Sequence, residues 1–187
     1  MSGEGLQRLR TLLLDGGGLM STLLAPGPNG HSATDDGSSP AALAAQGPRA
    51  AGRREEYELL IEAIYEGYLL HYERPRVVSV PEADLGLLAG DQLYAIGLAR
   101  LVSLGDTLAV AELADTITLS ALAQGAGERE LAAAVWEAGA RAVGWGPSDA
   151  HRRAKDLLLA GAPEALEAMR TSAGPIPGTP PIVPRYC

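Results

Sequence analysis

The sequence contains a single cysteine, Cys187, and no phenylalanine. One cysteine cannot form an intrachain disulfide, so nothing indicates an oxidising compartment, and we expect a cytoplasmic protein. Lysine is also nearly absent, because only Lys155 accompanies the arginines, whereas alanine and glycine are abundant. This composition is typical of a bacterium with GC-rich genes.

Positive charge is scarce. The chain has 23 acidic and 15 basic residues, which gives a formal net charge of −8 and a pI near 4.9. Binding to a phosphate backbone depends on lysine and arginine gathered on one face. The charge balance therefore argues against nucleic acid as a partner.

A long, uninterrupted apolar run is missing as well. Residues 1–15 hold only three consecutive leucines among several charges, which is unlike a signal peptide. Residues 85–104 approach the length of a membrane span, but Asp91, Gln92 and Arg100 interrupt them. Each charge at the centre of a bilayer costs ~2.5 kcal/mol or more. We expect no transmembrane segment and interpret this stretch as a buried helix of a soluble protein.

The composition divides the chain into four parts. Residues 1–24 contain an amphipathic segment that is too short to be stable alone. Residues 25–52 are rich in proline, glycine, serine and alanine, which predicts a disordered linker that packs on nothing. Residues 53–170 are predicted to form one helical domain, and residues 171–187 a proline-rich tail without helical period.

Apolar residues recur at three- and four-residue steps throughout the domain. The first stripe places Glu55, Glu58 and Glu62 on the opposite, polar face of its helix. No segment alternates as a strand would, so we predict an all-α, antiparallel helical bundle. That first stripe consists of Tyr57, Leu60, Ile61, Ile64, Tyr68 and His71. The predicted helices cover about 53–72, 81–104, 107–123, 128–143, 149–160 and 163–169.

The helix predicted at 81–104 is apolar on nearly every face, which is typical of a central helix packed on several sides. Gly90 and Gly97 lie one heptad apart and would let a neighbouring helix approach closely. Together with Ile96 and Leu101 they form our predicted interface. We therefore expect a homo-oligomer or a complex with another protein.

Three neighbouring stretches resemble the trans-polyprenyl diphosphate synthases. The central one, residues 87–124, reads LLAGDQLYAIGLARLVSLGDTLAVAELADTITLSALAQ and carries that family's L-A-G-D helix start and L-G-D loop. Residues 59–78 are similar to the family helix with the first aspartate-rich motif, and residues 127–144 to a helix beside the isoprenoid tunnel. The resemblance spans about 57–144 and implies part of an isoprenoid-synthase-like helical fold.

The residues that carry the family's chemistry are missing. The family ionises an allylic diphosphate with Mg²⁺ held by two D-D-x-x-D clusters. At the first cluster this chain has His71, Tyr72 and Glu73, and it contains no second cluster. Gly16–Gly18 stand where the family has a diphosphate-binding lysine. We therefore expect no catalytic residue, no metal site and no enzymatic activity from the protein alone.

Some residues remain as weak candidates for binding a ligand. Two arginines match the family's pyrophosphate loop, with a solvated loop as the alternative. Three tyrosines suit an isoprenoid slot or a partner interface, with core packing as the alternative. An aspartate inside the apolar helix suggests function or a structural hydrogen bond. These residues are Arg74, Arg76, Tyr68, Tyr72, Tyr94 and Asp91. His71 has no second metal ligand at suitable spacing, so we interpret it as a packed residue at a helix end.

Three functions are compatible with this pattern. The first is a non-catalytic interaction or scaffold subunit that associates with itself or with a partner. The second is a subunit that binds an isoprenoid or a quinone such as menaquinone, in which case a prenyl lipid would be its ligand. The third is the small subunit of a two-component polyprenyl diphosphate synthase, whose partner would supply both aspartate clusters.

Overall fold

The computed structural model describes residues 2–25, 39–80 and 82–174. Apart from one antiparallel bridge between Leu24 and Val78, these residues form helices and loops, which confirms the predicted all-α class. The helices are α1 (Ser2–Gly16), α2 (Gly18–Thr22), α3 (Pro40–Gln46), the 3₁₀ turn η1 (Pro48–Ala50), α4 (Arg54–Tyr72), α5 (Ala83–Ser103), α6 (Thr107–Gly125), α7 (Arg129–Trp145), α8 (Asp149–Leu159) and α9 (Ala165–Ala173).

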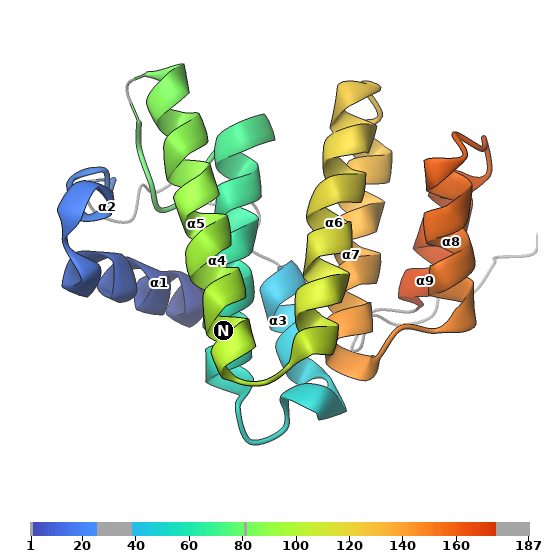
Figure 1. The fold of residues 1–187 in the computed structure, drawn as a ribbon, viewed down its shortest axis with the longest axis horizontal. Helices are drawn as coiled ribbons and strands as arrows, with labels where there is room; N and C mark the ends of the chain where they lie inside the picture. Colours follow the sequence, from blue (N-terminus) through green and yellow to red (C-terminus); the bar gives the residue numbers. More distant parts are fainter. Residues whose placement is uncertain (1, 26–38, 81, 175–187) are drawn as a thin grey trace, which may run out of the picture.

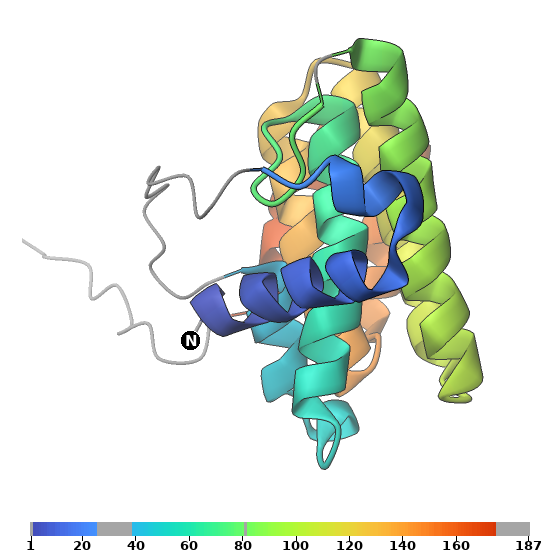
Figure 2. The ribbon, with the colours of Figure 1, turned by 90° about the vertical axis from the view of Figure 1, so that its left-hand side faces the viewer.

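Two antiparallel helix pairs form the centre of the molecule (Figure 1). The α4–α5 pair and the α6–α7 pair stand side by side, and α3 lies between them at one end, in contact with both α4 and α7. On the outer side of the first pair, α1 crosses α4 (Figure 2). On the outer side of the second pair lie α8 and α9. The long helices agree with the sequence prediction to within a few residues.

The linker prediction is wrong for residues 39–50, which belong to the core. Ser39 caps α3 by accepting a hydrogen bond from the Ala42 N–H at 3.1 Å. Ala41 and Ala44 are completely buried between α4 and α7. A Cβ atom on Gly47 would lie 2.1 Å from the Gly144 carbonyl oxygen, so only glycine fits there. Small residues let this segment approach its neighbours closely. Residues 26–38 lie outside the described part of the chain.

The N-terminal segment also packs on the domain. Leu9 and Leu13 of α1 are buried in one cluster with Val78 and Leu93. Backbone hydrogen bonds join residues 23–25 to the loop after α4, with Ser79 N–H donating to the Leu23 carbonyl at 2.8 Å. Helices this short depend on tertiary contacts for their stability. The apolar sides of α1 and α2 therefore belong to the core.

The α5 helix is peripheral, which corrects the prediction of a central helix. It packs mainly on α4, and its outer side exposes Leu88 (63%) and Val102 (58%). Among the described residues, α5 is the one helix whose length and composition would allow it to cross a membrane, with a mean hydropathy of 1.3 over its most apolar window. A third of that window (33%) is buried inside the protein. Core helices of soluble proteins meet the same criterion.

Asp106 connects three elements where the two pairs meet. Its carboxylate caps α6 by accepting from the Ala109 N–H at 3.0 Å and binds Arg49 of η1 at 2.7 Å. The Tyr57 hydroxyl of α4 donates a third hydrogen bond to it. Burial raises the pKa of Asp106, but these hydrogen bonds outweigh it and lower that pKa below its ordinary value. Burial and the Asp106 carboxylate raise the pKa of Tyr57 to about 12.

Candidate functional site

The predicted interface residues lie mostly inside the chain. A Cβ atom on Gly97 would lie 2.4 Å from Ile64 Cγ1, and Gly90 lies against His71, so both glycines allow close packing of α5 on α4. Leu101 is fully buried, and Ile96 packs half-buried in the cluster that includes α1. The close helix approach predicted from the glycines is present, but its partner is α4 of the same chain. These glycines are not available to a second chain.

The three candidate tyrosines do come together, in a layer that we call the aromatic row. The row consists of Tyr65, Tyr68, His71, Tyr72, Tyr94 and Trp136. The Tyr68 ring lies 5.2 Å from Trp136 and 5.4 Å from Tyr72, and His71 stacks on Tyr94 at 5.4 Å. Gln124 of α6 donates a hydrogen bond of 2.7 Å to the Tyr68 hydroxyl. The row therefore joins α4 to α5, α6 and α7.

Three polar atoms of the aromatic row are buried without a hydrogen-bond partner among the described residues. They are Tyr94 Oη, Trp136 Nε1 and His71 Nε2. His71 Nε2 lies 3.2 Å from Asp91 Oδ1, a carboxylate that is mostly exposed. Burial raises the pKa of Tyr94 far above its ordinary value, so its hydroxyl keeps its proton. Buried donors without acceptors are uncommon in native proteins and call for a physical explanation.

Asp91 and Arg74 contribute little to this layer. The Asp91 side chain is 70% exposed, so the expectation of a costly buried carboxylate is wrong. Arg74 is exposed in the loop that follows α4. Neither residue is enclosed by other groups as a binding residue would be.

Arg76 is occupied by two buried carboxylates of α4. Its guanidinium binds Glu62 at 2.5 Å and Glu66 at 3.2 Å, and both glutamate side chains are completely buried. The placement of Glu62 on a solvated face is therefore wrong. Burial alone would lower the pKa of Arg76, but the charges of Glu62 and Glu66 outweigh that effect and raise it. Arg76 is thus held in a structural role by the two carboxylates.

Glu66 also replaces missing backbone partners in the loop after α4. It accepts hydrogen bonds from the N–H groups of Arg76, Val77 and Val78 at 2.7, 2.6 and 3.1 Å. Since an unpaired buried N–H is costly, this carboxylate fixes the loop conformation. The sequence offered one signal, which is that Glu62 and Glu66 stand one helical turn apart among apolar and small residues.

A third buried carboxylate, Glu112 of α6, binds two residues of α8. His151 Nε2 lies 3.2 Å and Lys155 Nζ 3.1 Å from Glu112 Oε2, and Lys155 also binds Asp115 at 2.7 Å. Burial raises the pKa of Glu112, but the hydrogen bonds from His151 and Lys155 outweigh it and lower that pKa. Burial lowers the pKa of Lys155, but Asp115 and Glu112 outweigh it and raise that pKa. Sequence analysis missed this group because its members lie about 40 residues apart.

His151 also faces Ser172 of α9, which gives the order serine, histidine and carboxylate found in hydrolases. Ser172 Oγ lies 3.4 Å from His151 Nδ1, which is long for an activated nucleophile. The same hydroxyl donates a 2.8 Å hydrogen bond to the Met169 carbonyl within its own helix. We interpret this arrangement as structural, because the serine proton already has a partner.

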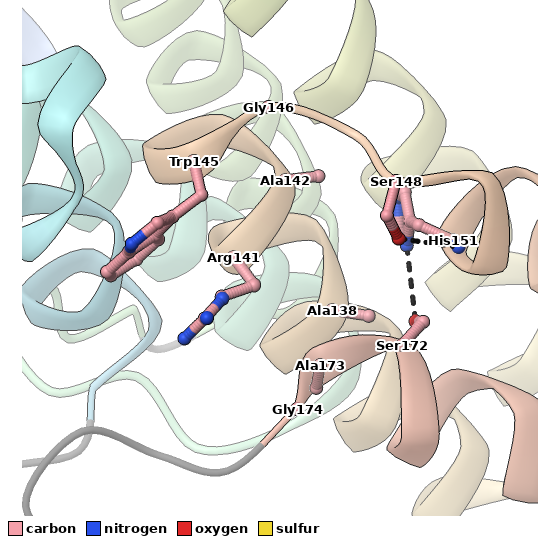
Figure 3. A pocket seen from close by; sticks show the side chains of 10 residues that line it. All are labelled: Ala138, Arg141, Ala142, Trp145, Gly146, Ser148, His151, Ser172, Ala173 and Gly174. Atoms are coloured by element: carbon pink, nitrogen blue, oxygen red, sulfur yellow. Dashed lines mark hydrogen bonds between the residues drawn. The ribbon is translucent and has the colours of Figure 1, made fainter.

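A small cavity lies beside these residues, between α7, α8 and α9 (Figure 3). Its volume is about 230 Å³. Arg141 and Trp145 stand at one side and Ser148, His151 and Ser172 at the other. The guanidinium carbon of Arg141 lies 4.3 Å from the centre of the Trp145 ring.

Within the described ranges, no group of three or more histidine, cysteine, aspartate or glutamate side chains is placed to hold a metal ion. Comparisons of the chain with protein-family models, with curated proteins and with solved structures gave no match. The resemblance to polyprenyl diphosphate synthases therefore stays a prediction that rests on the sequence motifs alone.

Proposed function

We propose that the protein is a non-catalytic helical interaction subunit that associates with a second copy of itself through the outer side of α5. The observation that carries this proposal is a stripe of exposed residues opposite the α4 contact. Its members follow helical spacing along one line of α5: Leu88, Gln92, Ala95, Ala99 and Val102. We call this line the outer stripe. It uses a different face of α5 from the buried glycines.

The sizes of the side chains make the outer stripe complementary to itself. Leu88 and Val102 stand at its two ends, and Gln92, Ala95 and Ala99 lie between them, of which the two alanines are small. If two copies pack antiparallel about a two-fold axis near Ala95, Leu88 of each copy meets Val102 of the other. The alanines then allow the two backbones to approach closely. Isologous contacts of this kind are the commonest in homodimers.

Other occupants fit the outer stripe less well. Asp84, Asp91 and Arg100 are exposed on α5, and burying such charges in a bilayer is expensive. The net charge of −8 opposes binding to nucleic acid. The exposed side of a helix is too open to enclose a small molecule, but a second helix can pack along it.

Size exclusion with light scattering tests the proposal. We expect the wild-type protein to be a dimer at tens of micromolar, and Leu88→Glu to be a monomer because it places a charge in the contact. Leu159→Glu on α8 is the matched control, since Leu88 and Leu159 are both 63% exposed. The control should remain a dimer. A monomeric wild-type protein, or equal effects of both substitutions, would contradict self-association through α5.

A second candidate function is binding of a prenylated quinone in the aromatic row. The unpaired donors Tyr94 Oη and Trp136 Nε1 support it, because quinone carbonyl oxygens accept hydrogen bonds and quinone rings stack on aromatic side chains. An organic extract of protein purified from quinone-producing cells should then contain the lipid, and Tyr94→Phe should reduce its amount. Extracts without lipid at a stoichiometric level would exclude this function.

Neither function requires prenyl transfer. We expect the isolated protein with Mg²⁺ and allylic and homoallylic diphosphates to give no product, because both aspartate clusters are missing from the sequence. Turnover above the enzyme-free background would overturn the non-catalytic assignment.

A further inference from the structure

The cavity between α7, α8 and α9 has walls of two kinds. Ala138, Ala142 and Ala173 leave space between the helices and give the cavity an apolar wall (Figure 3). Polar groups stand on opposite sides of this wall, with Arg141 on α7 and two serines on α8 and α9. A ligand in this cavity would therefore meet a cation, hydroxyl groups and an apolar surface together.

Arg141 differs from the other half-buried arginines of the described residues. Arg8 binds Glu58, Arg10 binds the Ala25 carbonyl and Arg76 binds two glutamates. Arg141 has no hydrogen bond or ion pair within the described part of the chain and is held only by stacking on Trp145. Stacking fixes the guanidinium plane but leaves its N–H donors available. Although the chain has an excess of acidic residues, none of those described pairs with Arg141, so its guanidinium is available to bind an anionic ligand.

The hydroxyl groups on the other side are partly used. Ser148 Oγ caps α8 by accepting from the His151 N–H at 3.1 Å, so its own proton is free to donate. The positive end of the α8 dipole lies at the same place and favours negative charge. Ser172 Oγ donates to the Met169 carbonyl and keeps its lone pairs for a donor. Free hydrogen-bond donors therefore stand on both sides of the cavity, Arg141 on one and Ser148 on the other.

We propose that this cavity binds a small organic anion, with its charged head group on Arg141 and a short apolar body against the alanine wall. A volume of about 230 Å³ has room for roughly eight non-hydrogen atoms. Carboxylates and phosphates share the required head-group chemistry, and guanidinium binds both in a bidentate manner. The site is independent of the α5 surface.

Titrations of the full chain test the site, with Trp145 as an internal fluorescent reporter and calorimetry as the second measurement. The probes are hexanoate, inorganic phosphate and the neutral control hexanol. We expect saturable binding of hexanoate, or of phosphate if the head group is a phosphate, and none of hexanol. Arg141→Gln should weaken binding at least about tenfold, since hydrogen bonds to charged groups carry that much discrimination.

Two further variants guard against indirect effects. Arg153→Gln removes an exposed arginine of α8 that does not line the cavity, and it should bind as the wild-type protein does. Ala142→Val fills part of the cavity without changing charge and should abolish hexanoate binding. The proposal is overturned if neither anion binds at about 10 mM, if hexanol competes equally with hexanoate, or if Arg153→Gln weakens binding as much as Arg141→Gln.

Discussion

The two halves of the molecule bury carboxylates in different surroundings. In the α4–α5 half, Glu62 and Glu66 are enclosed by Arg76 and by backbone N–H groups. In the α6–α9 half, Glu112 is bound by His151 and Lys155. The first group fixes a loop on a helix, whereas the second joins the helices α6 and α8. Buried carboxylates therefore have different structural roles in the two halves, because their partners differ.

The choice of partners also determines how each half responds to its environment. Arginine keeps its charge at every pH that a protein meets, and backbone N–H groups do not titrate. Lysine does titrate, and its ammonium can turn toward water when its partner is lost. Mutation of Glu62 or Glu66, which we call the α4 group, should therefore cost much folding stability. Mutation of Glu112, which with its partners forms the α6 group, should cost less, but the stability that this group gives should depend on pH.

Removal of α3, which connects the two halves, should have the largest effect on folding stability. Deleting residues 1–52 removes the helix that contacts both α4 and α7, and it removes Ser39, which donates a 2.9 Å hydrogen bond to Glu62. We expect the shortened chain to lose cooperative thermal unfolding. Deleting only residues 1–24 keeps α3 and should leave a cooperative but less stable fold. A cooperative transition in the shorter chain would show that α3 is dispensable.

Substitution of the buried glutamates sharpens the comparison. Glu66→Ala leaves three loop N–H groups and part of Arg76 without a partner, and we expect a loss of ~3–5 kcal/mol in the free energy of unfolding. Glu112→Ala should cost about 1–3 kcal/mol, because Lys155 retains Asp115. Glu55→Ala on the exposed side of α4 is the control and should change little. Urea titration measures all three. Equal losses for Glu66 and Glu112 would remove the proposed difference between the halves.

The α4–α5 contact gives a smaller effect that separates folding from association. Gly97→Leu places a side chain against Ile64 and should lower the stability of each chain by ~1–3 kcal/mol. Ala95→Leu lies on the outer stripe, so it should leave monomer stability unchanged and alter only association. Thermal melting and light scattering together distinguish the two. If Gly97→Leu dissociated the dimer without lowering the stability of the monomer, the packing of this glycine on α4 would be wrong.

Periodicity predicted the long helices well, because the apolar residues of α4, α6 and α7 recur at three- and four-residue steps. It failed for α3, whose apolar residues are mostly alanines; the Ser39 and Pro40 cap and the closing Gly47 were its only signals. Composition also misled for α5, because several of its large apolar residues, Leu87, Leu88 and Val102 among them, are exposed. Sequence could show that Gly90 and Gly97 meet a helix, but not which helix.

The candidate sites were harder to predict than the helices. The tyrosines of α4 share one helix face, so their gathering followed from spacing, whereas Trp136 comes from a helix about 70 residues away. The partners of Glu112 and the walls of the small cavity also come from separate helices. Single-sequence patterns describe neighbours along a helix. They contain no information on which faces of distant helices meet, and that decides whether a charged residue is solvated or buried.

The smallest expected effect is a difference in acid stability caused by Glu112. Its pKa is lowered in the folded state, so folding favours the ionised form. The stabilisation it gives is complete above the unfolded-state pKa of about 4.3 and disappears as the pH falls through the lower folded-state pKa. Lys155 has the opposite sign, because its raised pKa gives stabilisation that is lost only at high pH, above about 10.4. Between these limits the stabilisation from the shifted pKa values of Glu112 and Lys155 should be constant.

Glu112→Gln tests this sign directly, because the amide keeps the shape of the side chain and cannot titrate. We expect the variant to be less stable than the wild-type protein at pH 7, with the difference shrinking as the pH falls from about 5 to 3. Asp106 also has a lowered pKa, so the wild-type protein keeps part of its acid sensitivity in the variant. Urea titrations at a series of pH values measure the difference. If it stayed constant down to pH 3, the ionised Glu112 would not be what holds α8 on α6, and hydrogen bonding that an amide can also supply would explain the contact.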